Sequence, residues 1–487
     1  MQRDESLDPD DDGALRALAH RAVDDALDYL ATLRDRPAWQ PPPDDTATRF
    51  AQPLPRAPEG AEAAYADFVA HVMPYPMGNI HPRFWGWYMG TGTAFGALGD
   101  FLAAIVNPNM GGGNHVANHV ELQVVDWCKD IVGMPRDTSG LLVSGGSMAN
   151  FIGLAVARNA TAAAHGIDVR EAGVQGLAAR TTYYASAEVH SCAQKALEQL
   201  GLGSRALRKV PVDASYRIDV RALAAMIAAD RAEGIAPCCV IGNAGTINTG
   251  AIDDLSALAD LCAREQLWFH VDGAIGAVAA LSASQRPRLA GIERADSLAL
   301  DLHKWLHVPF EAGCALVRDR AAHRAAFALM PDYLGLHARG LAAGSHWFSE
   351  YGLQLSRGFR ALKVWLMFKE HGTDKLARLI DQNVAQAAAL GAMIDAHPEL
   401  ERMAPIGLNI VCFRYVAADR PPAQLDALNE ELLIRLHETG IAVPSYTKLG
   451  GRYCLRVAIA NHRTRGEDLQ IALDAIVTIG RELAATR

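Results

Sequence analysis

The sequence has few cysteines and no excess of basic residues. Eight cysteines are spread over 487 residues, and no two of them form a C-x-x-C pair with the spacing of a metal site. This excludes a disulfide scaffold, predicts no metal centre and favours buried thiols in a reducing compartment. The net charge of −9 disfavours binding to nucleic acid or to an anionic membrane surface, so we expect neither as a partner.

Long apolar runs are also lacking. No stretch of about 18 uninterrupted apolar residues is present, which predicts that the chain does not span a membrane. Residues 1–10 are acidic and have neither the basic start nor the apolar core of a signal peptide. We therefore expect a soluble, cytoplasmic protein.

The amino-terminal part of the chain alternates between helical and extended patterns. Apolar residues at helical spacing predict helices over residues 13–36 and 61–73. Between them, the proline-rich residues 37–58 predict an extended strap, because proline interrupts regular helix. These pieces have little core of their own, so we expect them to pack on another domain or subunit.

The middle of the chain has the pattern of an α/β fold. Between residues 140 and 317, short apolar runs alternate with Ala- and Leu-rich helical segments, which predicts βα units and a mainly parallel sheet. From about residue 373 a long helix, strand candidates at 408–413 and 453–458, and a helix at 466–483 predict a smaller α+β domain. The expected parts are thus an N-terminal helical and strap segment (1–75), a large domain (76–372) and a small C-terminal domain (373–487).

A glycine-rich turn follows the first strand candidate of the large domain. Residues 144–150 read Ser-Gly-Gly-Ser-Met-Ala-Asn and lead into an apolar helix. Such a turn, which contains Gly146 and Ser147 and precedes an apolar helix at 151–157, can present backbone N–H groups to a phosphate. The alternative is a plain strand–helix turn in which Ser147 is a helix cap.

Two further strand ends carry polar residues. His190 follows the strand candidate at 182–186. It is either an ordinary loop residue or an imidazole that stacks on the ring of an aromatic cofactor. Thr246 lies in a run of small residues, 243–250, that either reaches a ligand or forms an ordinary turn.

The most specific motifs are His-Val-Asp-Gly-Ala at 270–274 and Asp-Leu-His-Lys at 301–304. Asp272 ends a buried strand, where a carboxylate needs a partner such as a protonated pyridine nitrogen. Lys304 follows the next strand candidate, so both side chains are expected in one crevice at the carboxyl ends of the strands. A phosphate cradle, a stacking imidazole, an acid and an amine together predict a site for pyridoxal 5'-phosphate.

The order of these motifs resembles the group II pyridoxal-phosphate-dependent amino-acid decarboxylases, and in particular their aromatic-L-amino-acid and histidine decarboxylase branch. The resemblance covers most of the chain and includes residues 81–84, 330–334 and 356–365. It implies the fold-type I transferase fold, and a homodimer whose N-terminal segment wraps the partner subunit and whose active site lies at the interface.

The resemblance also implies a role for each site residue. Lys304 carries the cofactor, Asp272 holds the pyridinium nitrogen and His190 stacks on the ring. The remaining cofactor contacts are Gly146, Ser147, Thr246, Ala274 and His303.

The sequence departs from the pattern of that family in two places. Asp301 and Leu302 replace the Asn-Pro that often precedes the family's His-Lys, which places another carboxylate near the cofactor. The family's loop tyrosine, thought to protonate the substrate carbon after CO₂ leaves, is matched here by Gly344. We expect residues 335–345 to form a mobile lid, and His337, His346 or Tyr351 to replace the tyrosine as proton donor.

The expected activity is decarboxylation of an L-amino acid to the amine and CO₂. The aromatic residues Trp85, Trp87 and Tyr88 favour an aromatic or otherwise bulky substrate side chain if they line the pocket, and are otherwise core. The alternatives are an aldehyde synthase, in which O₂ intercepts the reaction, and a carbon–carbon lyase. A silent scaffold protein is disfavoured, because a scaffold needs neither Lys304 nor Asp272.

Overall fold

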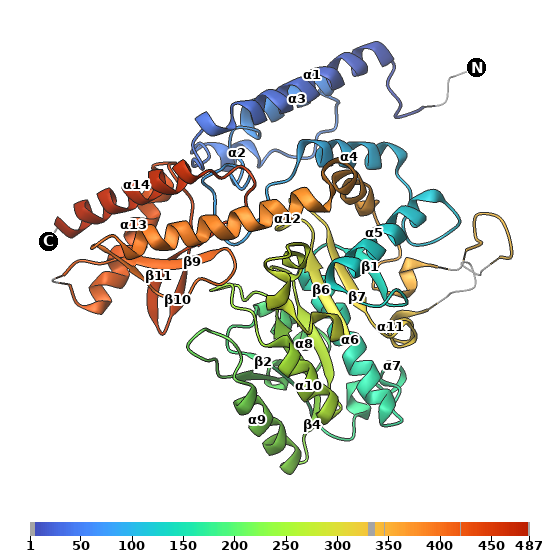
Figure 1. Cartoon of the computed structure of the whole chain (residues 1–487). Coiled ribbons are helices and arrows are strands. Elements are labelled where there is room, and N and C mark those ends of the chain that lie inside the picture. Colours follow the sequence, from blue (N-terminus) through green and yellow to red (C-terminus); the bar gives the residue numbers. More distant parts are fainter. Residues whose placement is uncertain (1–4, 330–336, 345, 419, 486–487) are drawn as a thin grey trace. The chain divides into compact units, whose positions relative to one another are not determined.

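Seven strands form the larger of two sheets, in the order β1-β7-β6-β5-β4-β2-β3 (Figure 1). Strand β7 pairs antiparallel with both β1 and β6, and all other pairs are parallel. The predicted α/β class with a mainly parallel sheet is therefore confirmed. The strands are β1 (Ser139–Val143), β2 (Thr181–Ser186), β3 (Leu207–Val210), β4 (Ala236–Asn243), β5 (Trp268–Asp272), β6 (Ser297–Asp301) and β7 (Gly313–Val317).

Both faces of this sheet are covered, which explains why its strands are apolar throughout. Alternate residues of a strand enter different hydrophobic clusters: Leu142 and Val271 belong to one, and Leu141 and Ile241 to two smaller ones. Helices α6 (Gly146–Ala164), α8 (Ser191–Gln199) and α11 (Arg320–Phe327) supply or contact the smaller clusters. Helices α5 (Val116–Val132), α9 (Val220–Ala232) and α10 (Leu255–Glu265) supply the larger one.

A second, antiparallel sheet has the order β10-β11-β9-β8. Its strands are β8 (Leu400–Arg402), β9 (Ile410–Tyr415), β10 (Ser445–Leu449) and β11 (Arg452–Ala458), so the strands expected near 408–413 and 453–458 are confirmed. Helix α12 (Arg360–Asp395) contacts β8 and β9 and also α4 (Ala94–Val106) and α5. It is interrupted at Gly372, whose φ of 67° is in the region that favours glycine.

The computed structural model describes residues 5–329, 337–344, 346–418 and 420–485. The chain forms two compact units, and the first consists of Met1–Phe84, Ala427–Val443 and Arg463–Arg487. The second consists of Trp85–Asp426 and Pro444–His462 and contains both sheets. These two units are defined by compactness and not by independent folding. The three-part division expected from the sequence therefore stays a prediction. The other helices are α1 (Asp12–Ala31), α2 (Thr46–Arg49), α3 (Ala61–His71), α7 (Val169–Ala172), α13 (Pro422–Glu438) and α14 (Gly466–Ala485).

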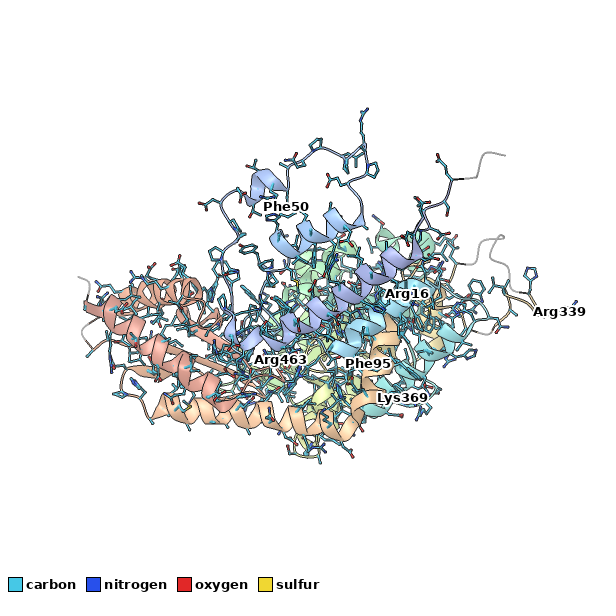
Figure 2. The ribbon with its side chains drawn as sticks, turned by 90° about the horizontal axis from the view of Figure 1, so that it is seen from above. Arg16, Phe50, Phe95, Arg339, Lys369 and Arg463 are labelled. Carbon is cyan, nitrogen blue, oxygen red and sulfur yellow. The ribbon has the colours of Figure 1, made fainter. Side chains whose placement is uncertain are left out.

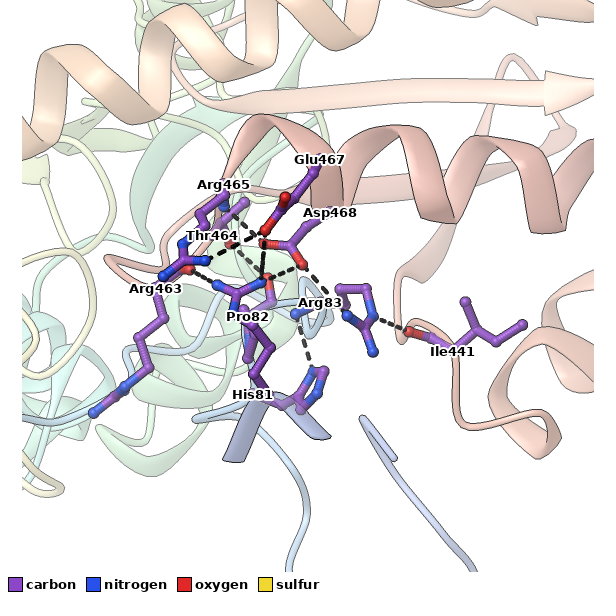
Figure 3. A network of polar contacts seen from close by, with 10 residues as sticks. His81, Pro82, Arg83, Ile441, Arg463, Thr464, Arg465, Glu467 and Asp468 are labelled. Carbon is purple, nitrogen blue, oxygen red and sulfur yellow. Dashed lines mark hydrogen bonds and ion pairs between the residues drawn. The ribbon is translucent and has the colours of Figure 1, made fainter. Parts of the chain in front are cut away.

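Within the first unit, a buried carboxylate joins the two ends of the chain (Figure 3). Arg34, just after α1, donates to both Oδ1 and Oδ2 of Asp468 at 2.8 and 3.0 Å. Arg83 reaches Oδ1 of the same carboxylate at 3.4 Å and donates to the carbonyl oxygen of Ile441. The strap adds a backbone bond from Ala38 N to Gly440 O. The N-terminal segment thus packs against the C-terminal helices of its own chain.

Among the described residues, no helix is both long and apolar enough to cross a membrane.

Candidate active site

The carboxyl ends of five strands meet at a pocket of about 400 Å³ in the second unit. Strands β1, β6, β5, β4 and β2 all run in the same direction, so the residues that follow or end them share one edge of the sheet. The lining residues are Ser144–Met148, Asn150, His190, Cys192, Asn243, Gly245, Ile247, Asp272, Ala274, Ile275, Asp301, His303, Lys304, Phe310 and Glu311.

Lys304 forms an ion pair inside this pocket. Its Nζ lies 2.9 Å from Oδ2 of Asp301, the carboxylate that ends β6. Burial lowers the pKa of Lys304, but the charge and hydrogen bond of Asp301 outweigh burial and raise that pKa above its ordinary value. Lys304 is therefore held as an ammonium in the protein without cofactor.

The glycine-rich turn lies against the same carboxylate. Helix α6 begins at Gly146, and no side chain caps its first turn, so backbone N–H groups at this end remain for a ligand. A Cβ atom on Gly146 would lie 2.8 Å from Oδ2 of Asp301 and 2.9 Å from Cβ of Ala274, which explains the glycine. His303 lies 3.8 Å from the carboxylate and accepts a hydrogen bond from Ala312 N through Nδ1.

Asp272 and His190 face the pocket from β5 and from the loop after β2. Oδ1 of Asp272 accepts from the backbone N–H of Ala274 at 3.1 Å, and among the described residues Oδ2 has only the thiol of Cys192, at 3.9 Å. Oδ2 is thus a buried acceptor with capacity for a strong donor. Nδ1 of His190 accepts from Cys192 N, and burial lowers the pKa of this imidazole against the opposing effect of Asp272.

Thr246, His346 and Tyr351 were predicted as site residues, but none of them lines the pocket in the described part of the chain. Thr246 lies between the lining residues Gly245 and Ile247, but its hydroxyl accepts from Ala251 N. His346 stacks on Tyr351 with ring centroids 4.7 Å apart, and Tyr351 belongs to a hydrophobic cluster against β1.

The predicted lid, residues 335–345, is described only over 337–344. Gly344 is exposed there and has a φ of 119°.

Several lining residues were missed by the sequence analysis. Asn150 is part of the glycine-rich motif, and Cys192 lies two positions after His190, so both were close to recognised signals. Phe310 and Glu311 come from the loop before β7 and have no motif of their own. They line the pocket because the fold brings this loop back to the edge of the sheet, which the sequence does not reveal.

Comparison with known proteins agrees with this geometry. The sequence profile described as "Pyridoxal-dependent decarboxylase conserved domain" matches residues 43–416. An aromatic-L-amino-acid decarboxylase of Bacillus atrophaeus is 34% identical over 474 residues, covering 96% of each chain. A phenylacetaldehyde synthase of Arabidopsis thaliana is 26% identical and covers 93% of each chain.

The fold has a similar counterpart among solved structures. The crystal structure of Oryza sativa TDC with PLP and tryptamine has a TM-score of 0.89 and 26% identity, covering 98% of this chain and 99% of that one. The expected fold, pyridoxal phosphate cofactor and enzyme class are confirmed by these matches. This chain belongs to the pyridoxal-dependent decarboxylase family.

Proposed function

We propose that this enzyme decarboxylates an L-amino acid with an aromatic or other bulky side chain, giving the amine and CO₂. The observation that carries the proposal is the convergence of Lys304, Asp272, His190 and the uncapped start of α6 in one pocket. An amine, a buried acid, a neutral ring and a phosphate cradle are the groups that pyridoxal-phosphate chemistry requires.

The pocket residues fit the cofactor on structural grounds. The first turn of α6 and Ser147 offer donors to a phosphate, and the missing side chain of Gly146 leaves its backbone accessible beside Ala274. At the other end, Oδ2 of Asp272 has no donor stronger than a thiol in the described part of the chain. A protonated ring nitrogen would complete the hydrogen bonding of this carboxylate.

Each predicted residue has a defined task in this proposal. Pyridoxal phosphate, when bound, supplies an electron sink for the pair of electrons left by departing CO₂. Asp272 would keep the ring nitrogen protonated, because a neighbouring carboxylate raises the pKa of such a nitrogen. The imidazole of His190 would stack on the ring. Lys304 would bind the cofactor covalently, and the ammonium that it carries at rest would first lose its proton to Asp301 or to solvent.

The substrate class rests on the relatives. The Bacillus relative is an aromatic-L-amino-acid decarboxylase, and the Oryza structure contains tryptamine. The aromatic residues near position 85 give no further support, since Trp85 and Tyr88 are buried and Trp87 is half exposed, and none of the three lines the pocket.

The sequence predicts His346 and Tyr351 as candidate donors of the proton to the substrate carbon. Burial lowers the pKa of His346 to about 4, so this imidazole is neutral near pH 7 and has no readily released proton. Burial raises the pKa of Tyr351, so its phenol keeps its proton at neutral pH. Of these two predicted donors we therefore favour Tyr351. To act as the donor, Tyr351 would have to move from the hydrophobic cluster against β1 to the pocket.

An aldehyde synthase is the second candidate function. It is favoured by Gly344 at the position of the family's loop tyrosine and by the similarity to the Arabidopsis phenylacetaldehyde synthase. Without a donor for the substrate carbon, O₂ can react instead, and the products become aldehyde, ammonia and peroxide.

The test is an amino-acid panel assayed for CO₂, amine, aldehyde and peroxide together. We expect one amine per CO₂ with an aromatic substrate, no activity in Lys304→Ala, and a loss of about 10²–10⁴ in rate for Tyr351→Phe if it is the donor. Stoichiometric peroxide in the wild type would establish the aldehyde synthase. Gly344→Tyr should then restore amine. Gly344→Phe is the matched control, because it has the same backbone strain at a φ of 119° without the hydroxyl.

We also propose that the enzyme is a homodimer. Helix α4 exposes six large apolar side chains, of which Phe95 is labelled in Figure 2: Phe95, Leu98, Phe101, Leu102, Ile105 and Val106. A contiguous apolar surface of this kind marks an interaction site, because its exposure to water is unfavourable. The family resemblance implies that a second copy of the chain binds there. Analytical sedimentation tests the proposal. We expect the wild type to be a dimer and Phe101→Glu to dissociate more readily.

A cytoplasmic location remains part of the proposal. All eight cysteines are buried and free, which is the usual state in a reducing compartment.

A further inference from the structure

His270 is hydrogen-bonded to Asn150, a residue that lines the pocket, and has no assigned role. It precedes Asp272 by two residues on β5, so both side chains point to the face of the sheet on which α6 packs. The ring is fully buried. Its Nε2 lies 2.7 Å from Oδ1 of Asn150 and its Nδ1 lies 2.7 Å from Oγ of Ser297.

The direction of these hydrogen bonds follows from the neighbouring donors. The amide nitrogen of Asn150 donates to the carbonyl oxygen of Gly146 at 2.8 Å, so the amide oxygen is left as an acceptor and Nε2 of His270 carries the proton. Nδ1 then accepts from the hydroxyl of Ser297, which itself accepts from the indole N–H of Trp268 at 2.8 Å. Burial lowers the pKa of His270 to about 4, which keeps the ring neutral in this tautomer.

This chain of hydrogen bonds connects the two ends of the candidate cofactor site. Asn150 lies next to the first turn of α6, and its bond to Gly146 fixes the start of the phosphate cradle. The same amide also reaches Sγ of Cys192 at 3.6 Å, and that sulfur lies 3.9 Å from Oδ2 of Asp272. His270 thus holds α6 to the strand that bears the acid.

Helix α6 is shaped to receive the ring. A Cβ atom on Gly153 would lie 2.6 Å from both Cε1 and Nδ1 of His270, and 3.0 Å from Oγ of Ser297. Gly153 is one helical turn beyond Asn150, on the same side of α6. A side chain at this position would push either the ring or the helix away.

We propose that His270 is a positioning residue that fixes the start of α6 relative to Asp272. In this arrangement the distance between the start of α6, which would bind the phosphate, and Asp272, which would bind the ring nitrogen, stays fixed. The inference rests on the proposed function, because it concerns the same site.

The test uses cofactor-free protein and two ligands that cannot attach to Lys304, pyridoxine 5'-phosphate and pyridoxine. Both have the ring nitrogen, but only the first has the phosphate. We expect His270→Phe and Gly153→Ala to weaken binding of pyridoxine 5'-phosphate by about 10- to 100-fold. Loss of an outer-shell hydrogen-bond partner has an effect of this size on the affinity of metal sites. Binding of pyridoxine should change by less than about threefold. His270→Gln, which keeps a neutral donor, should recover most of the lost affinity.

His323→Phe is the matched control. His323 is also fully buried and makes two hydrogen bonds, to Ser139 and to the carbonyl oxygen of Tyr351, but it does not line or underlie the pocket. It should leave the ratio of the two affinities unchanged even if stability falls. An unchanged ratio in Gly153→Ala, together with an unchanged ratio in His270→Phe, overturns the inference. If His270→Phe does not fold, Gly153→Ala alone decides it. If the wild type binds neither ligand, the proposed function itself fails.

Discussion

The Nζ atom of Lys304 lies 2.9 Å from Oδ2 of Asp301, and this carboxylate is almost completely buried. Oδ1 of Asp301 has no hydrogen-bond partner among the described residues. Lys304 is therefore the main compensation for a buried negative charge, and Asp301 in turn stabilises the ammonium. Because only the unprotonated amine attacks an aldehyde, this pair opposes covalent attachment of the cofactor.

Asp301→Asn should shift the pH dependence of cofactor uptake. The pair raises the pKa of Lys304, so the reactive amine appears only at higher pH, and removing the carboxylate lowers that pKa. We expect the midpoint of the uptake rate, followed by absorbance in cofactor-free protein, to move to lower pH. Glu311→Gln is the control, since Glu311 also lines the pocket but pairs with Arg360. An identical profile for wild type and Asp301→Asn would contradict the assignment.

Lys304 should be the residue that borohydride reduction labels with the pyridoxyl group. Peptide mapping after reduction measures this directly. Lys363 is the informative competitor, because it is also buried and burial lowers its pKa, but it pairs with Asp100 at 3.1 Å and does not line the pocket. A pyridoxyl mass on Lys363 or on Lys195 would refute the proposed site.

Asp468→Asn should destabilise the first unit. The carboxylate is fully buried and bonded to Arg34 and Arg83, and breaking a buried pair leaves its partners uncompensated. We expect a loss of about 3 kcal/mol in the free energy of unfolding, because Arg34 keeps some access to water. Urea titration, with tryptic cleavage near residues 34–56 as a local probe, measures the effect.

Glu467→Gln is the control for that variant. Glu467 is the neighbouring residue, is mostly exposed and lies 3.7 Å from Arg34, so its loss should cost less than about 0.5 kcal/mol. Equal effects of the two variants would show that burial of Asp468 does not matter.

Buried histidines should make the protein sensitive to acid. Burial lowers the pKa of His323 to about 3 from an ordinary 6.5, so below pH 6.5 the unfolded chain binds a proton that the folded chain does not. Stability therefore falls as the pH decreases from about 6.5. In His323→Gln, the loss in unfolding free energy between pH 6.5 and 5 should be smaller by about 2 kcal/mol. Urea titrations at the two pH values give the difference, and equal losses in both proteins would contradict the shift.

The sequence by itself determined the α/β class and the main site residues. Asp272, His190 and Lys304 each follow an apolar strand, and in a parallel sheet such positions share one edge whatever the details of packing. The strands that carry these motifs were therefore predictable from local patterns. Helix α6 was expected from residue 151 but begins at Gly146, because glycines hide the start of a helix from periodicity.

Tertiary structure alone decided the contacts between residues far apart in the chain. The bond between His270 and Asn150 spans 120 positions, and that between Arg34 and Asp468 spans 434, so no local pattern could reveal either. The place of Tyr351 in the cluster against β1, and with it the stacking of His346 on Tyr351, likewise depends on packing that the sequence near them does not specify. Residue type and strand order fix which groups reach a sheet edge, whereas their charge state and partners depend on what the folded chain brings around them.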